Sequence, residues 1–86
     1  MSRKRDFEKV LNSEYVTISE LVQLTDNRYS TLKYYTEENM IPFIQEGEGL
    51  VRRYHRETSI ERIDLIKYLK TKGLTIVEIK KKMNIK

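Results

Sequence analysis

The chain has 86 residues, of which 38% are hydrophobic and 35% are charged. Domains take roughly 100 to 200 residues each, so this length suits one small domain and excludes most multidomain enzymes. Seventeen Lys and Arg residues against thirteen Asp and Glu residues give a formal net charge of +4. A positive balance makes polyanions the first class of partner to consider.

Other classes of protein are excluded by what the sequence lacks. It has no Cys, which excludes a disulfide framework and any thiolate metal or redox site. No apolar run approaches the roughly 18 to 20 residues that cross a bilayer, and the basic run 3–5 precedes Asp6 where a signal peptide would have its apolar segment. We therefore expect a cytoplasmic protein with no membrane partner.

Residues 1–14 are predicted to form either a basic N-terminal arm or a short helix, ahead of a domain over 15–86. Phe7, Val10 and Leu11 have helical spacing and follow the basic run Arg3-Lys4-Arg5. That run can act as a minor-groove arm, although a solvated charge cluster is the simpler interpretation.

A helix over 18–25 is predicted next. Thr17 and Glu20 have the spacing of a capping box, in which each side chain accepts a hydrogen bond from the other residue's backbone N–H. One apolar face follows, made of Ile18, Leu21, Val22 and Leu24. Asp26-Asn27 then favours a turn.

A second helix is predicted over 28–38. Tyr29, Leu32 and Tyr35 are spaced to share the inward face, and the residues between them then point outward: Ser30, Thr31, Lys33 and Tyr34. Asn39 and Pro42 end the helix. Two short helices joined by a polar turn indicate a helix-turn-helix, whose second helix carries the contact surface.

A β-hairpin is predicted from two β-prone runs, 43–45 and 50–54, that flank Glu46-Gly47-Glu48-Gly49. Arg52 and Arg53 on the second strand can bind backbone phosphates or enter a minor groove. Basic residues also protect strand edges from pairing, which is the alternative explanation. Tyr54 suits either a backbone contact or a hydrophobic position under the hairpin.

Two further helices complete the chain. Thr58 or Ser59 can cap a helix that runs to about Lys72 and stops at Gly73, and Thr75 with Glu78 repeats the capping-box spacing before a helix from residue 76. The run 80–82 is interpreted as mostly solvated lysines, with a phosphate-facing patch as the alternative. The single histidine, His55, is expected in an exposed loop.

This order of elements predicts a mostly α fold, a winged helix-turn-helix with four main helices and a small two-stranded β-hairpin wing. Several segments, taken together, resemble the N-terminal DNA-binding domain of the MerR family, whose pattern includes T-I-G-E-L, L-T-G, T-L-R-Y-Y-E, L-I-P, R-x-Y and G-x-S-x-x-E-I. They are Thr17-Ile18-Ser19-Glu20-Leu21, Leu24-Thr25, Thr31-Leu32-Lys33-Tyr34-Tyr35-Thr36-Glu37-Glu38, Ile41-Pro42, Arg52-Arg53-Tyr54 and Gly73-Leu74-Thr75-Ile76-Val77-Glu78-Ile79. The resemblance covers about residues 15 to 83.

Some positions depart from the family pattern. Ser30 and Lys33 replace arginines, Thr36 replaces a glutamate, and Asp26-Asn27 replaces Gly-Val. These changes lie in the second predicted helix and the turn before it, and they leave the predicted fold intact. Members commonly continue into a long dimerising helix and an effector or metal-binding region, and these 86 residues contain neither.

The resemblance implies a DNA-binding surface on the second helix and the wing. Arg28 is the candidate base contact, whereas Lys33 and Tyr34 are candidate phosphate contacts. The full predicted set is Arg28, Tyr29, Ser30, Thr31, Lys33, Tyr34, Arg52, Arg53 and Tyr54.

We therefore expect a sequence-specific double-stranded DNA binder, a transcriptional regulator that acts as a homodimer or multimer on DNA. One alternative is an excisionase-like or plasmid-partition protein that coats DNA architecturally. Another is a protein-interaction module whose positive charge only aids solubility. Catalysis, a metal and a cofactor are not expected, because one His, no Cys and scattered Ser residues assemble no catalytic or metal-binding group.

Overall fold

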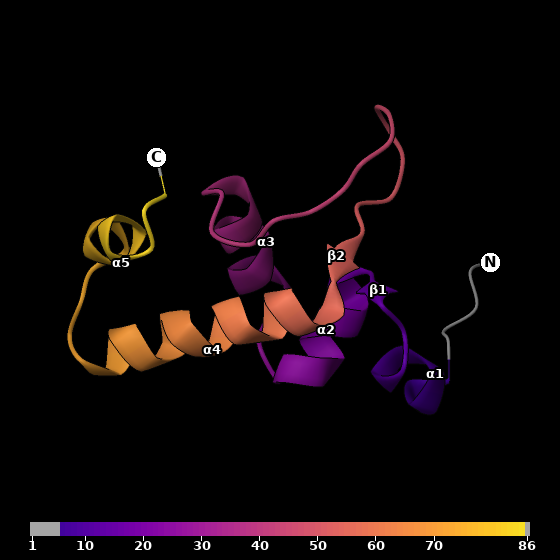
Figure 1. Cartoon of the computed structure of the whole chain (residues 1–86), viewed down its shortest axis with the longest axis horizontal. Coiled ribbons are helices and arrows are strands. Elements are labelled where there is room, and N and C mark those ends of the chain that lie inside the picture. The colour runs from indigo at the N-terminus through magenta and orange to yellow at the C-terminus, as the bar shows by residue number, and fades with distance from the viewer. Residues whose placement is uncertain (1–5, 86) are drawn as a thin grey trace.

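The computed structural model describes residues 6–85. Its elements, in chain order, are α1 (Phe7–Leu11), β1 (Tyr15–Val16), α2 (Ile18–Thr25), α3 (Tyr29–Glu37), β2 (Tyr54–His55), α4 (Arg56–Thr71) and α5 (Ile76–Lys82) (Figure 1). The predicted mostly helical fold with four main helices, α2 to α5, is confirmed. In the N-terminal segment, residues 7–11 are helical, and the basic run 3–5 lies outside the described residues. None of the helices over 6–85 is long and apolar enough to cross a membrane.

The helix ends follow the local signals in the sequence. Both predicted capping boxes are formed: the Thr17 side chain accepts from the Glu20 N–H and Glu20 accepts from the Thr17 N–H, and Thr75 and Glu78 do the same. The hydrogen bonds from Thr75 hold the pKa of Glu78 below its ordinary value. Gly73 follows α4 with φ +85°, a left-handed conformation that glycine adopts without a steric cost.

The sheet is not where the hairpin prediction placed it. β1 pairs antiparallel with β2, with Val16 opposite Tyr54 and Tyr15 opposite His55. The runs 43–45 and 50–54 meet only at one bridge, where the backbones of Ile44 and Arg53 exchange two hydrogen bonds of 2.8 Å. β2, at the C-terminal end of the wing, therefore pairs with β1, which lies 39 residues earlier in the sequence. The local sequence pattern does not indicate this long-range contact.

The N-terminus of α4 also differs from the prediction, and His55 is the reason. Its Nδ1 accepts a hydrogen bond from the Thr58 N–H at 3.3 Å, so His55 is the N-cap and the helix begins at Arg56. The ring packs edge-on against Tyr15, with 5.6 Å between the ring centroids. His55 is thus a half-buried cap, and its expected place in an exposed loop was wrong.

The core lies among α2, α3 and the long helix α4; in Figure 1, α3 lies above α4 and α2 lies below it. α5 packs on the C-terminal part of α4 and extends the core to Ile79. The buried hydrophobic residues are Val10, Val16, Leu21, Leu32, Tyr35, Met40, Ile41, Tyr54, Ile63, Ile66 and Ile79. α3 is therefore held on a rigid base, since it packs against α2 and its own buried residues belong to this core.

Ser59 on α4 is fully buried, and its hydroxyl has no hydrogen-bond partner among the described residues. Burying a hydroxyl without a partner costs about 1–3 kcal/mol. We expect Ser59→Ala to raise the free energy of unfolding by about that amount, measured by urea denaturation. Thr36→Val is the matched control, because the buried Thr36 hydroxyl is hydrogen-bonded, and it should lower stability. A loss of stability in Ser59→Ala would contradict this account of the Ser59 hydroxyl.

Candidate nucleic-acid interface

α3 has one buried face and one exposed face, as its spacing predicts in part. Leu32, Tyr35 and Thr36 are buried. The outward direction of Ser30, Lys33 and Tyr34 is confirmed, whereas Thr31 is half-buried. Tyr29 was predicted to face inward, yet it is 52% exposed. The buried residues of α3 lie toward its C-terminal end. The beginning of the helix, which includes Tyr29, therefore extends past the core into solvent.

The connection from α2 to α3 places the beginning of α3 at the surface. Asp26 ends α2 in the left-handed conformation, φ 53°, and the Asn27 side-chain amide donates to the Thr25 carbonyl at 3.1 Å. Arg28 is the N-cap of α3 and provides no side-chain hydrogen bond to the helix. The first N–H groups of α3 therefore lack a side-chain cap, and such groups bind anions well.

The wing is the segment between α3 and β2, and its base carries the two predicted arginines. Arg53 is exposed and its backbone forms the bridge to Ile44. The Arg52 guanidinium lies over the Phe43 ring, 4.7 Å from the ring centroid. A cation stacked on an aromatic face keeps its edge donors free while its position is fixed. Arg52 is thus held in place without losing its capacity to bind phosphate.

Tyr54 joins the wing to α3. The Phe43 and Tyr54 rings are 6.2 Å apart, and the Tyr54 hydroxyl lies 3.0 Å from the Thr36 hydroxyl. Thr36 donates its only hydroxyl proton to the Leu32 carbonyl at 2.9 Å, so Tyr54 is the donor to Thr36. Tyr54 is 1% exposed. Of the two positions open to it from sequence, Tyr54 occupies the one under the wing.

Tyr54→Phe is expected to lower the free energy of unfolding by about 0.5–1.5 kcal/mol, the net value of one hydrogen bond. Because the buried hydroxyl is not at the surface, the affinity for duplex DNA should stay unchanged at every salt concentration. Thermal denaturation and anisotropy titrations at several salt concentrations measure the two quantities. Tyr68→Phe, which removes an exposed hydroxyl on α4, outside α3 and the wing, is the matched control. A loss of DNA affinity in Tyr54→Phe, with the variant fully folded and the control unchanged, would show that Tyr54 contacts phosphate directly.

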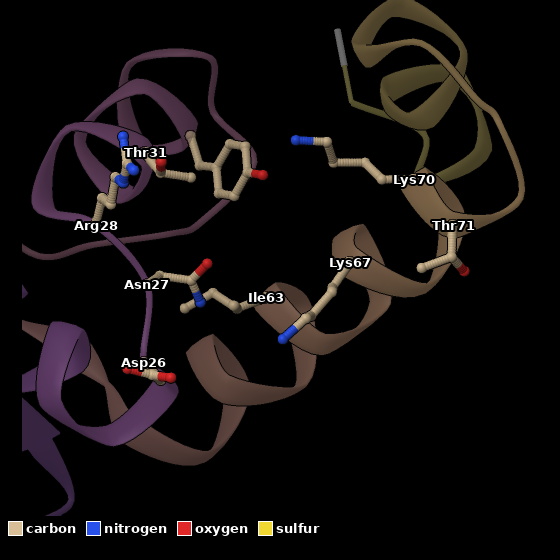
Figure 2. Close-up of a pocket in the computed structure, with 9 residues that line it drawn as sticks. Asp26, Asn27, Arg28, Thr31, Ile63, Lys67, Lys70 and Thr71 are labelled. Atoms are coloured by element: carbon tan, nitrogen blue, oxygen red, sulfur yellow. The ribbon is translucent and has the colours of Figure 1, made fainter.

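A pocket of about 460 Å³ opens between the beginning of α3 and the C-terminal half of α4. Figure 2 shows Arg28 and Thr31 on its α3 wall and Lys67 and Lys70 on the facing α4 wall. Lys67 and Lys70 are exposed, and sequence reasoning did not assign them to the site. Their spacing of three on one helix face was a signal, but only the packing of α4 against α2 and α3 places them opposite Arg28.

The basic side chains of this surface are available to an anion. Among residues 6–85, the cations in ion pairs are Arg56, with Glu57, and Lys80, with Glu38 at 3.1 Å. Neither belongs to α3 or to the wing. In the same part of the chain, no three His, Cys, Asp or Glu side chains are gathered as a metal site would require. Beside the Asp26 carboxylate of the pocket, the surface therefore offers an excess of positive charge and hydroxyl groups, the chemistry that binds phosphates and base edges.

The site is therefore a helix-turn-helix with an exposed second helix and a wing that carries arginines. Basic groups lie on both sides of the second helix. The assignment of individual DNA contacts to the nine predicted residues stays a prediction. Searches of curated proteins and of solved structures give no match. The family model for MerR HTH family regulatory proteins matches residues 16–85, so the chain belongs to the MerR family of helix-turn-helix, DNA-binding transcription regulators.

Proposed function

We propose that this chain is a sequence-specific double-stranded DNA-binding transcription regulator that lays α3 in the major groove and its wing on the flanking backbone or minor groove. One observation carries the proposal. Lys33 and Tyr34 project from α3, and the contacts through Phe43, Tyr54 and Thr36 tie Arg52 of the wing to the same helix. A fixed relation between helix and wing is what two-point docking on a duplex requires.

The proposed contacts divide into two kinds. Arg28, at the beginning of α3, reads a base edge, and Ser30 and Tyr29 approach the groove beside it. Phosphates are bound by Lys33 and Tyr34 on one side of the groove and by Arg52 and Arg53 on the other. Tyr54 acts as a positioning residue, because it is buried and holds the wing against α3.

The pocket adds a third point of contact. Thr31 lies on its α3 wall beside Arg28, and Lys67 and Lys70 lie on the α4 wall. A phosphate that enters this pocket would meet positive charge from both helices, together with the uncapped N–H groups of α3. We propose that it receives a backbone phosphate next to the bases read by α3.

The proposed function is tested by selecting duplexes from a random pool and then measuring anisotropy with the best and a scrambled sequence. We expect an enriched motif and a preference of at least about 10³-fold for it. Equal binding of both duplexes would indicate an architectural DNA binder. No binding at low salt, with a folded circular dichroism spectrum, would refute DNA binding and favour a protein-interaction module.

Regulators of this fold gain specificity when two copies occupy neighbouring half-sites, since one short helix reads few base pairs. We propose that this chain acts as a homodimer or multimer on DNA, in the cytoplasmic compartment where a regulator meets its DNA. The architectural alternative uses the same fold with copies in a continuous row. It is favoured by one feature of the wing, its acidic tip, on which the next inference is based.

A further inference from the structure

The tip of the wing, residues 44–51, has the wrong charge for a DNA contact. It contains Glu46 and Glu48 and no Lys or Arg. Both carboxylates are exposed, and so are the apolar side chains of Ile44, Leu50 and Val51, the last at 67%. Carboxylates repel DNA phosphates. The tip therefore suits a partner surface that is basic and partly apolar.

Internal hydrogen bonds give the tip a defined conformation. The Leu50 N–H donates to the Gly47 carbonyl at 3.2 Å, and the Gln45 side-chain amide donates to the Leu50 carbonyl at 2.7 Å. Gly49 has φ +77°, which lets the chain reverse between Glu48 and Leu50. These contacts hold the carboxylates and the apolar side chains on one small turn. Because the turn is already ordered, a partner that binds it loses little free energy in fixing its conformation.

The chain itself carries a surface of the opposite charge. On α5, Val77 is 63% exposed, and Lys81, one turn later, lies on the same face. Lys82 is also exposed, whereas Lys80 turns inward to its ion pair with Glu38. We call Val77, Lys81 and Lys82 the α5 face. It joins an apolar group to two cations, of which Lys81 also interacts with the exposed Glu78, so its net charge stays positive and complements the two carboxylates and the apolar groups of the wing tip.

The wing tip and the α5 face lie toward opposite ends of the molecule (Figure 1). The two surfaces of one copy therefore do not meet each other. Two different surfaces that fit each other can make a heterologous contact, which propagates in an open row unless the rotation between copies closes it into a ring.

We propose that the wing tip of one copy docks on the α5 face of the next copy, so that neighbouring copies associate head to tail. In this contact, Glu46 and Glu48 pair with Lys81 and Lys82. The apolar side chains of Val51 and Val77 are buried at the same interface. Copies on adjacent DNA sites meet at high effective concentration. The effect on DNA rests on the proposed function, whereas the contact itself does not.

Cross-linking tests the contact without DNA. The chain has no Cys, so Glu48→Cys/Lys82→Cys introduces the only thiols. After oxidation of the concentrated protein, we expect a ladder of dimers, trimers and longer species. Glu48→Cys/Gln23→Cys is the control, because Gln23 is exposed on α2, away from the α5 face, and it should give no trimers. A control ladder of equal yield, or no ladder from the Glu48/Lys82 pair, overturns the proposal.

Charge reversal tests the contact on DNA, with duplexes that carry one or two selected sites. We expect the second copy to bind at least about fivefold tighter beside the first, a usual size for coupling between sites. Glu46→Lys/Glu48→Lys and Lys81→Glu/Lys82→Glu should each abolish this gain. The chain with all four changes should regain it, because both charges are then inverted.

Affinity for the one-site duplex separates this result from a change in DNA binding itself. The added lysines of the wing variant raise that affinity through general attraction to phosphates, without restoring the gain at the second site. Cooperativity retained in either reversed variant, or absent from the chain with all four changes, overturns head-to-tail docking. If no variant binds DNA, the proposed function fails and the cross-linking result alone decides the contact.

Discussion

Replacing Lys33 and Arg52 together by alanine is expected to weaken duplex binding at least tenfold at moderate salt and to weaken it for all sequences alike. Lys33 is exposed on α3, and Arg52 is held on the Phe43 ring at the wing base. A charge-assisted hydrogen bond contributes about 1.5–3 kcal/mol, and about 1.4 kcal/mol corresponds to tenfold. Each lost phosphate contact also removes about one unit from the slope of log K against log salt concentration.

The measurement is an anisotropy titration of the parent and the variants at four or more salt concentrations. The double variant should lose about two units of slope. Lys9→Ala is the control, since Lys9 is an exposed lysine of α1, outside the proposed interface. It removes one positive charge and should leave the slope unchanged. A double variant that binds as tightly as the parent would show that α3 and the wing do not dock on DNA together.

Of the substitutions proposed for stability measurements, Leu32→Ala is expected to lower the free energy of unfolding the most. Leu32 is fully buried in α3, and truncation of a buried leucine costs about 2–5 kcal/mol. A domain of this size has roughly 4–13 kcal/mol in all, at about 0.05–0.15 kcal/mol per residue. The variant should therefore be partly unfolded at physiological temperature. Urea denaturation followed by circular dichroism at 222 nm, roughly the helical minimum, measures the change.

Tyr29→Ala is the matched comparison on the same helix. Tyr29 is 52% exposed, so its removal should change stability by only about 0.5 kcal/mol, as at other surface positions. DNA binding should weaken all the same, because Tyr29 lies on the proposed contact face. If Tyr29→Ala destabilised the chain as much as Leu32→Ala, the inward position predicted from spacing would be correct and the exposed position wrong.

The sequence by itself determined the features that depend on residues three or four apart. The capping boxes at Thr17 and Thr75 and the stop at Gly73 involve neighbours along the chain, and all of them form as predicted. The outward direction of Lys33 and Tyr34 follows from helical periodicity in the same way. Family membership was also predictable, because the MerR pattern is carried by these local segments.

The tertiary structure alone decided which distant segments meet. β2 pairs with β1, and the wing strands hardly pair, because backbone hydrogen bonding has no sequence signature across 39 residues. Tyr29 is exposed although its spacing matches Leu32, since the core covers only the later turns of α3. His55 caps α4 because the same pairing with β1 holds it at the start of that helix.

The candidate site shows the same division. Arg28, Lys33, Arg52 and Arg53 were identified from a pattern, because charge and spacing are readable along the chain. The link from Tyr54 to Thr36 and the position of Lys70 opposite Arg28 became visible only in the packed structure. Local sequence sets the chemistry that each segment presents, whereas long-range packing decides which of those groups share one surface, and that shared surface is what a duplex would meet.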